Sequence, residues 1–148
     1  MQDPAILVVD DNPDHLELTV MALAEGCGQK HIDTASDGVE ALDYLFGRGA
    51  HAGRDTGRQP RVVGLDLEVG RPHGLDGLRT LRADPRTATV PILVHSSSTE
   101  KGDIAACYAA GANAYVGKAT DYEELRRRMR HACEFWVTVN EPCEPRPV

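Results

Sequence analysis

The chain has 148 residues, of which 41% are hydrophobic and 26% are charged, and its formal net charge is −7 at pH 7. A chain of this length can form one globular domain around a single hydrophobic core, and the composition is ordinary for such a domain. The negative net charge argues against nucleic acid or an anionic lipid surface as a partner, and no apolar run reaches the roughly 18 residues that a membrane-spanning helix needs.

Short apolar runs alternate along the chain with segments in which apolar residues recur at helical spacing. The first run, residues 6–9 (ILVV), predicts a buried strand. Asn12 can cap a helix and Pro13 suits a first helical turn, so we expect a helix to follow at once. A weaker strand is predicted over residues 31–36, and a second helix after Asp37.

A long connection rich in Gly and Arg, residues 47–60, separates this helix from the second half of the chain. Connections of this length are uncommon in compact domains. The alternating pattern then resumes, and the final helix is the longest, with Asp121 as a suitable N-cap. The later elements are expected to be strands over residues 61–65, 91–95 and 114–117, and helices over about residues 75–81, 104–110 and 121–139.

Five successive strand–helix repeats predict an α/β fold with a parallel sheet and helices on both faces. We expect the flavodoxin-like doubly wound (βα)5 arrangement, with the five strands in the order 2-1-3-4-5. A single domain over residues 1–140 holds all of these elements, and residues 141–148 (EPCEPRPV) are expected to be a flexible, Pro-rich tail. The N-terminus has no signal peptide and the four cysteines include no CxxC pair, so we expect a cytoplasmic protein whose cysteines are thiols.

Polar side chains stand at the predicted carboxyl ends of the strands, where sheets of this type bind ligands. Asp10 and Asp11 follow the first strand and Asp66 follows the third, and these two strands should be neighbours. Three carboxylates in one place repel one another unless a cation intervenes, and Mg²⁺ prefers oxygen ligands. Ser96 after the fourth strand adds a hydroxyl donor, and Lys118 after the fifth adds a positive charge. This set can stabilise the transfer of a phosphoryl group to a carboxylate.

Four segments resemble the motifs of response-regulator receiver domains, the CheY-like superfamily of two-component signalling systems. The resemblance covers nearly the whole chain, and it is specific because five matching positions occur in the right order, each at a strand end. The segments are ILVVDDNPD (residues 6–14), RVVGLDLEVG (61–70), VPILVHSSS (90–98) and NAYVGKA (113–119).

The resemblance implies a role for each matching position. Asp66 is the phosphoacceptor, which receives its phosphoryl group from a phospho-His of a sensor histidine kinase in a reaction that needs Mg²⁺ or Mn²⁺. Lys118 pairs with a phosphoryl oxygen, the hydroxyl of Ser96 turns toward the phosphoryl group, and Tyr115 occupies an aromatic switch position. The implied metal ligands are the side chains of Asp10, Asp11 and Asp66 and the backbone carbonyl of Glu68.

A narrower resemblance connects the chain with the single-domain regulators that partner bacterial and cyanobacterial phytochromes. The features that carry it are the long connection over residues 47–60, the SSS after the fourth strand, the absence of Pro after Lys118 and the ending CEFW (133–136). In that subfamily the final helix is extended and supports homodimers. Apolar residues along this helix predict such an interface here, with folding back onto the domain's own surface as the alternative. These residues are Leu125, Met129, Phe135 and Trp136.

The main hypothesis is therefore a stand-alone response regulator that signals by protein–protein contact, with a phytochrome-type kinase as donor. We expect no catalysis beyond its own phosphorylation and dephosphorylation, and no output domain after residue 139. One alternative is a receiver-like binding module that works without phosphorylation. The other is a phosphatase of the haloacid-dehalogenase type, which uses an Asp nucleophile and a second acid two residues later, where Glu68 stands.

Several positions depart from the receiver pattern. Gly64 leaves a strand position without a side chain, Gly70 stands where receivers usually have Pro, and Ala119 replaces a Pro that is often cis. These departures bear on loop conformation and on the lifetime of the phosphoryl group rather than on the site itself. His95, one residue before Ser96, is expected to be a neutral core residue.

Overall fold

The structure, a computed structural model, describes residues 6–28, 31–70 and 73–143. Five parallel strands form one sheet in the order β2-β1-β3-β4-β5, which confirms the flavodoxin-like arrangement. The strands are β1 (Ile6–Val9), β2 (Ile32–Ala35), β3 (Val62–Asp66), β4 (Ile92–Ser96) and β5 (Ala114–Gly117). The α-helices are α1 (Pro13–Cys27), α2 (Gly38–Phe46), α3 (Gly74–Ala83), α4 (Lys101–Ala110) and α5 (Tyr122–Cys133).

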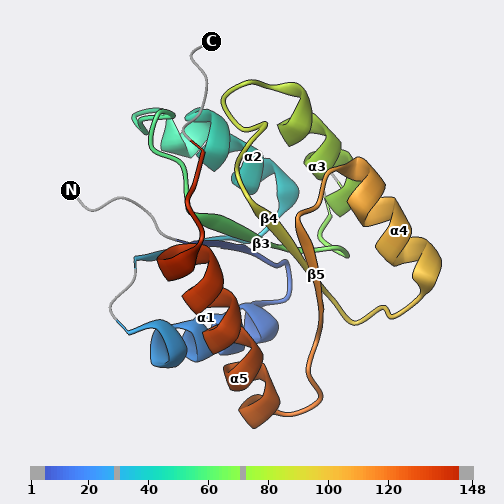
Figure 1. Ribbon diagram of the computed structural model, residues 1–148. Helices are drawn as coiled ribbons and strands as arrows, with labels where there is room; N and C mark the ends of the chain where they lie inside the picture. Colours follow the sequence, from blue (N-terminus) through green and yellow to red (C-terminus); the bar gives the residue numbers. More distant parts are fainter. Residues whose placement is uncertain (1–5, 29–30, 71–72, 144–148) are drawn as a thin grey trace.

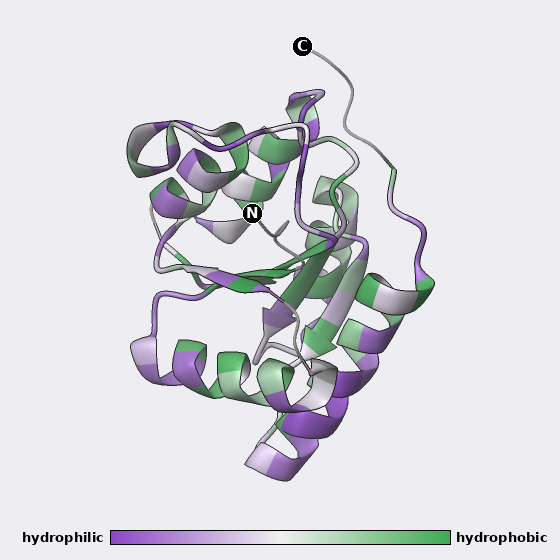
Figure 2. Cartoon of the chain, turned by 90° about the vertical axis from the view of Figure 1, so that its left-hand side faces the viewer, coloured by the Kyte–Doolittle hydropathy of each residue, from purple (hydrophilic) through white to green (hydrophobic). Residues whose placement is uncertain are grey.

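Helices cover both faces of the sheet, with α1 and α5 on one face and α2, α3 and α4 on the other (Figure 1). Side chains alternate between the two faces along β1, as the period of two in a strand requires. Ile6 and Val8 join the core under α1 and α5, whereas Leu7 and Val9 join the core under α2 and α3. Figure 2 shows the central strands as mostly hydrophobic and the helices as mixed. Among the described helices, none is both long enough and apolar enough to cross a membrane.

Side-chain caps fix where two of the helices begin. The side chain of Asn12 accepts hydrogen bonds from the N–H groups of Asp14 (3.0 Å) and His15 (3.2 Å). The side chain of Asp121 accepts one from the N–H of Glu124 at 2.9 Å. Both caps satisfy backbone donors that the first turn of a helix leaves unpaired, as the sequence predicts. The cap at Asn12 also holds His15 in the first turn of α1.

The long connection over residues 47–60 is packed against α2. It contains a short 3₁₀ helix, Gly49–His51 (η1), and its structure depends on Arg54. The guanidinium carbon of Arg54 lies 4.0 Å from the centre of the Tyr44 ring, and the group donates to the backbone carbonyls of Tyr44 and of Arg58. A planar guanidinium can stack on a ring and bind carbonyls at the same time. One side chain therefore ties the middle and the later part of the connection to α2.

The final helix has the length that the sequence predicts. α5 ends at Cys133 and continues as a wider, π-type helix over Glu134–Val139 (η2). The side chain of Arg61 donates to the carbonyl of Val137 at 3.1 Å and fastens this end to the sheet. Residues 141–143 are exposed and irregular, and the rest of the expected tail lies outside the described residues. Cys133 is disulfide-bonded, so the expectation that every cysteine is a thiol is wrong at this position.

The four residues expected at a dimer interface differ in their burial. Met129 is 4% exposed, and Leu125 and Trp136 pack partly buried against the same core, whereas Phe135 is 48% exposed. Met129 therefore belongs to the core of the subunit and offers no surface to a partner. The expected interface is corrected at this residue, because helical periodicity alone cannot tell a core-facing position from a partner-facing one.

Candidate functional site

Three acids meet at the carboxyl ends of β1 and β3. Asp10 directly follows β1, Asp11 comes next, and Asp66 is the last residue of β3. The two strands are neighbours, with Val9 opposite Leu65. As a result, one carboxylate oxygen from each acid lies within 4.8 Å of the others. Asp10 and Asp66 are only 3% and 5% exposed, whereas Asp11 is open to solvent.

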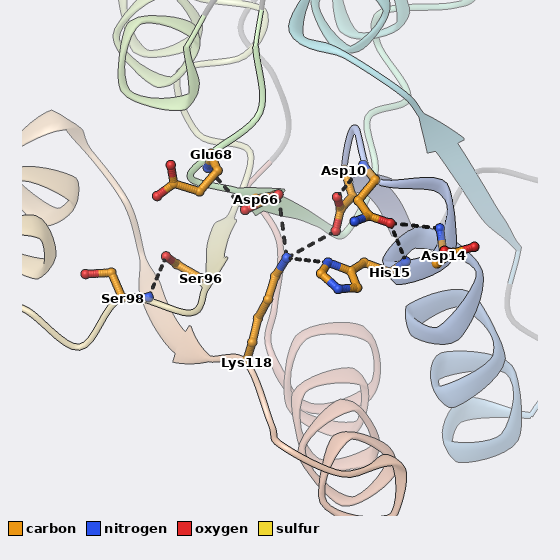
Figure 3. A network of polar contacts seen from close by, with 9 residues as sticks. Asp10, Asp14, His15, Asp66, Glu68, Ser96, Ser98 and Lys118 are labelled. Carbon is orange, nitrogen blue, oxygen red and sulfur yellow. Dashed lines mark hydrogen bonds and ion pairs between the residues drawn. The ribbon is translucent and has the colours of Figure 1, made fainter.

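Backbone amides and one ammonium hold the two buried acids. The N–H of Asn12 donates to Oδ1 of Asp10 at 2.9 Å, and the N–H of Glu68 donates to Oδ1 of Asp66 at 3.1 Å. In both cases the donor stands two residues after the acid, in the turn that ends the strand. The other oxygens face Lys118, whose Nζ lies 3.4 Å from Oδ2 of Asp10 and 3.6 Å from Oδ2 of Asp66 (Figure 3).

Lys118 reaches the acids from the end of β5, at the edge of the sheet. Its backbone N–H donates to the carbonyl of Ser96 at 2.8 Å, which continues the pairing of β4 with β5 beyond Gly117. The sheet therefore fixes the backbone of Lys118. The flexible methylene chain of its side chain carries Nζ to the carboxylates. A lysine in this position supplies a point charge that can follow the group it binds.

The charges in the site favour a further cation. Burial raises the pKa of Asp66, and the nearby Asp10 also raises it, whereas the N–H of Glu68 and the ammonium of Lys118 lower it. Three carboxylates stand against one ammonium. Carboxylate oxygens are the ligands that hard divalent ions such as Mg²⁺ and Mn²⁺ prefer. The acidic pocket formed by Asp10, Asp11 and Asp66 thus has the donor atoms to hold such an ion.

Ser96 and Tyr115 are linked through one residue of the loop after β4. The fully buried hydroxyl of Ser96, which lies beside Asp66 in Figure 3, accepts a hydrogen bond from the N–H of Ser98 at 3.1 Å. The hydroxyl of Tyr115 donates to the carbonyl of the same Ser98 at 2.8 Å. The Tyr115 ring packs against the cluster that contains Cys107. A movement of Ser96 would therefore reach Tyr115 through Ser98.

This combination of fold and site matches a known family. A family model, the response regulator receiver domain, matches residues 6–130. The chain belongs to the response-regulator receiver family. The match covers all five strands and most of α5, so it includes every strand end that contributes to the site.

The receiver domain is similar over nearly its whole length to several known proteins. A probable methanogenesis regulatory protein, FilR2 of Methanothrix harundinacea, is 32% identical over 146 residues, which are 97% of this chain and 91% of that protein. The phosphorylated cyanobacterial phytochrome response regulator RcpA has a TM-score of 0.85 at 28% identity, over 95% of this chain and 99% of that one. Response regulator RPA3017, from red light signalling of R. palustris, has a TM-score of 0.86 at 27% identity, over 95% and 98%.

Glu68 contributes to the receiver site through its backbone. The backbone N–H of Glu68 donates a hydrogen bond to Oδ1 of Asp66, whereas the Glu68 side chain is exposed. Figure 3 shows the carboxylate of Glu68 turned away from Asp66. This orientation suits a residue that would offer a metal its carbonyl, which is the role that the family resemblance implies.

Two histidines border the receiver site without a function predicted from the sequence. Nδ1 of His15 lies 3.4 Å from Nζ of Lys118. His95 is buried, and its Nε2 has no hydrogen-bond partner within the described ranges. Burial lowers the pKa of His95 to about 4, and the charge of Lys118 contributes to the shift, so the ring is neutral, as expected. A helix that begins at Pro13 puts His15 in its first turn, close to the end of the first strand. The sequence could therefore have placed His15 near the acids.

A small cavity lies under the site, between the sheet and the layer of α1 and α5. Its volume is about 40 Å³, and its lining is mostly apolar but includes Asp10, Asp66 and His95. Gly64 of β3 forms part of the wall. A Cβ added at Gly64 would have no atom nearer than the carbonyl oxygen of Leu7 at 4.0 Å. The missing side chain therefore leaves part of this space open.

Proposed function

We propose that this receiver domain accepts a phosphoryl group on Asp66 from a phospho-His of a sensor histidine kinase. The convergence of Asp66 with two further carboxylates and with Lys118 carries the proposal. A buried acid is a poor nucleophile by itself, because burial favours its protonated form. A divalent cation held by Asp10, Asp11 and Asp66 would favour the carboxylate form of Asp66 and would supply positive charge for the phosphoryl oxygens.

The chemistry is a displacement at phosphorus. A carboxylate oxygen of Asp66 attacks the phosphorus atom, the P–N bond to the donor histidine breaks, and its electron pair stays on the imidazole. The product is an acyl phosphate. Lys118 neutralises one phosphoryl oxygen, and the hydroxyl of Ser96, once it leaves the N–H of Ser98, donates to another. Mg²⁺, or Mn²⁺, supplies the remaining positive charge when bound, and its ligands would be Asp10, Asp11, Asp66 and the carbonyl of Glu68.

The output proceeds through the loop after β4. Because Ser98 binds both Ser96 and Tyr115, a turn of the Ser96 hydroxyl toward the phosphoryl group alters the hydrogen bond that holds the Tyr115 ring. The surface around α4, β5 and α5 changes with that ring. We expect the altered surface to contact a partner protein, with Tyr115 as the switch residue.

The donor that we propose is a phytochrome-type kinase in the cytoplasm. The support is the similarity to RcpA, a phytochrome response regulator, and to RPA3017, a regulator from red light signalling, over at least 95% of this chain in each case. Both similarities extend past the matched family region into the end of the final helix. That helix is also where we propose a homodimer contact.

Intact mass spectrometry after incubation with Mg²⁺ and phosphoramidate or acetyl phosphate tests the phosphoacceptor. We expect a mass gain equal to one HPO₃ group, which disappears in Asp66→Asn and when Mg²⁺ is removed. The matched control is Asp76→Asn, at an exposed carboxylate on α3 that pairs with Arg79. This change should not alter the adduct.

Other outcomes of the same experiment favour the alternative functions. A wild-type protein that gains no mass from any donor points to a binding module that works without phosphorylation. Sustained release of phosphate from phosphomonoesters points to a phosphatase. That chemistry needs a second acid directed at the substrate, which the outward orientation of the Glu68 side chain does not provide (Figure 3).

A further inference from the structure

The ammonium of Lys118 has three acceptors around it, one of which is not a carboxylate. Oδ2 of Asp10 and Nδ1 of His15 both lie 3.4 Å from Nζ, and Oδ2 of Asp66 lies 3.6 Å away (Figure 3). An ammonium has three N–H donors, so these acceptors can use all of them. Each distance exceeds the usual value of about 2.9–3.0 Å, as expected when one group is shared among three partners.

A divalent cation would take two of these three acceptors away. Asp10 and Asp66 belong to the acidic cluster that could hold the ion, and they are also the carboxylates that contact Lys118. The ammonium and the ion therefore compete for the same two carboxylates and repel each other. His15 lies outside the acidic cluster. Its Nδ1 remains available to Lys118 after the ion has bound.

Both ends of the His15–Lys118 contact are held in place by backbone hydrogen bonds. The N–H of His15 donates to the capping side chain of Asn12, in the first turn of α1. The N–H of Lys118 donates to the carbonyl of Ser96, at the end of β5. Lys118 and His15 also line the same surface groove, together with the neutral His95. The imidazole thus stands beside the route by which the ammonium can move away from the carboxylates.

We propose that His15 is a positioning residue that receives the Lys118 ammonium when a divalent cation occupies the acidic cluster. The imidazole accepts one N–H of Lys118 at Nδ1 in the tautomer that carries the ring proton on Nε2. Lys118 then stays close to Asp66 and ready for a phosphoryl oxygen, instead of blocking the metal ligands. This inference rests on the proposed phosphoryl transfer, and it adds a role for α1 that the matching motif positions do not include.

Mg²⁺ affinity, measured by titration calorimetry on the full chain, tests the proposal. His15→Phe keeps a ring but removes the acceptor, so we expect it to weaken Mg²⁺ binding by about 3- to 10-fold, the effect of losing one hydrogen bond to a charged group. His15→Asn places an acceptor near the position of Nδ1 and should stay within about twofold of the wild type. The matched control is His131→Phe, at an exposed histidine of α5, which should leave the affinity unchanged.

A double-mutant cycle with Lys118→Met separates this role from a general structural effect. In the Lys118→Met background, His15→Phe should cause no further loss of Mg²⁺ affinity, because the group that His15 receives is absent. Equal losses in both backgrounds, or a His15→Phe protein with wild-type affinity, would overturn the inference. The proposed function fails differently, by the absence of an Asp66 adduct in the wild type. An adduct together with unchanged Mg²⁺ affinity in His15→Phe rejects the positioning role alone.

Discussion

Burial shifts the pKa values of Asp66 and His95 in opposite directions. It raises the pKa of Asp66 and lowers the pKa of His95, and in each case it favours the neutral form of the side chain. Asp66 has the ammonium of Lys118 at 3.6 Å, which lowers its pKa, whereas the same positive charge lowers the pKa of His95 further. The site therefore makes one buried group reactive and keeps its neighbour uncharged, which avoids a second positive charge beneath the carboxylates.

The neutral state of His95 predicts a loss of stability in mild acid. The pKa of His95 in the folded chain is about 4, against an ordinary value of 6.5, so between these values the unfolded chain binds a proton that the folded chain does not. Stability from this group is complete above the unfolded pKa and declines as the pH falls. Between about pH 7 and pH 5 the free energy of unfolding should fall by up to about 2 kcal/mol from this cause.

Urea unfolding of the wild type and of His95→Leu at both pH values measures this contribution. We expect the wild type to lose more stability than His95→Leu on acidification, because leucine has no proton to gain. His131→Leu, at an exposed histidine, should retain the wild-type pH dependence. An equal stability difference between wild type and His95→Leu at both pH values would contradict the prediction.

Two glycines at β3 and at the start of α3 have opposite structural roles. Gly64 faces the small cavity, and an added Cβ there would meet nothing closer than 4.0 Å. Gly74 begins α3 directly against the end of β3, where an added Cβ would lie 2.7 Å from the carbonyl oxygen of Leu67 and 3.2 Å from that of Asp66. The second glycine is required for α3 to start this close to the phosphoacceptor, whereas the first is not required by packing.

Alanine at these two positions should change stability in opposite directions. Gly64→Ala is expected to raise the free energy of unfolding by about 0.5–1 kcal/mol, because it restricts the unfolded chain and fills open space. Gly74→Ala is expected to lower it by about 1–3 kcal/mol, since the carbonyls of Leu67 and Asp66 must shift. Urea denaturation gives both values. The rate of adduct formation should fall in Gly74→Ala and stay near wild type in Gly64→Ala, and the reverse order would contradict this assignment.

The end of the final helix exposes two large apolar side chains, those of Phe135 and Val139. Phe135 is 48% exposed, and its ring is held against Trp136 in an edge-to-face contact with 4.9 Å between ring centres. Val139, one turn further, is also exposed. Trp136 itself packs against the core. The Phe135 ring therefore rests on Trp136 on one side and is exposed to solvent on the other. A fixed aromatic side chain of this kind is typical of interface anchors.

We expect the protein to be a homodimer that Phe135→Glu converts to a monomer. A carboxylate on this surface would be desolvated by the partner helix, at a cost that a contact of moderate size cannot offset. Light scattering at tens of micromolar measures the mass in solution. Val39→Glu is the matched control, since Val39 is 49% exposed on α2, away from this helix, and should leave the dimer intact. A clean wild-type monomer at these concentrations would contradict the prediction.

The order of the strands and the membership of the acidic site were predictable from the sequence alone. The periods of strands and helices and the caps at Asn12 and Asp121 are local signals, and a parallel sheet brings the carboxyl ends of its strands to one edge. The sequence therefore predicts that Asp10, Asp11 and Asp66 lie close together. The predicted strand ends are one residue short at β3 and β4, because pairing with neighbouring strands extends them to Asp66 and Ser96.

Only the tertiary structure decided how deeply each group is buried and which distant side chains meet. His15 and Lys118 are 103 positions apart in the chain, and no local pattern indicates that their nitrogens come within 3.4 Å. Met129 and Phe135 belong to the same apolar helix in sequence, but the sheet covers only the first. The physical reason is the same in both cases. Periodicity and spacing report the backbone path of one element, whereas contact and burial depend on the elements that pack against it.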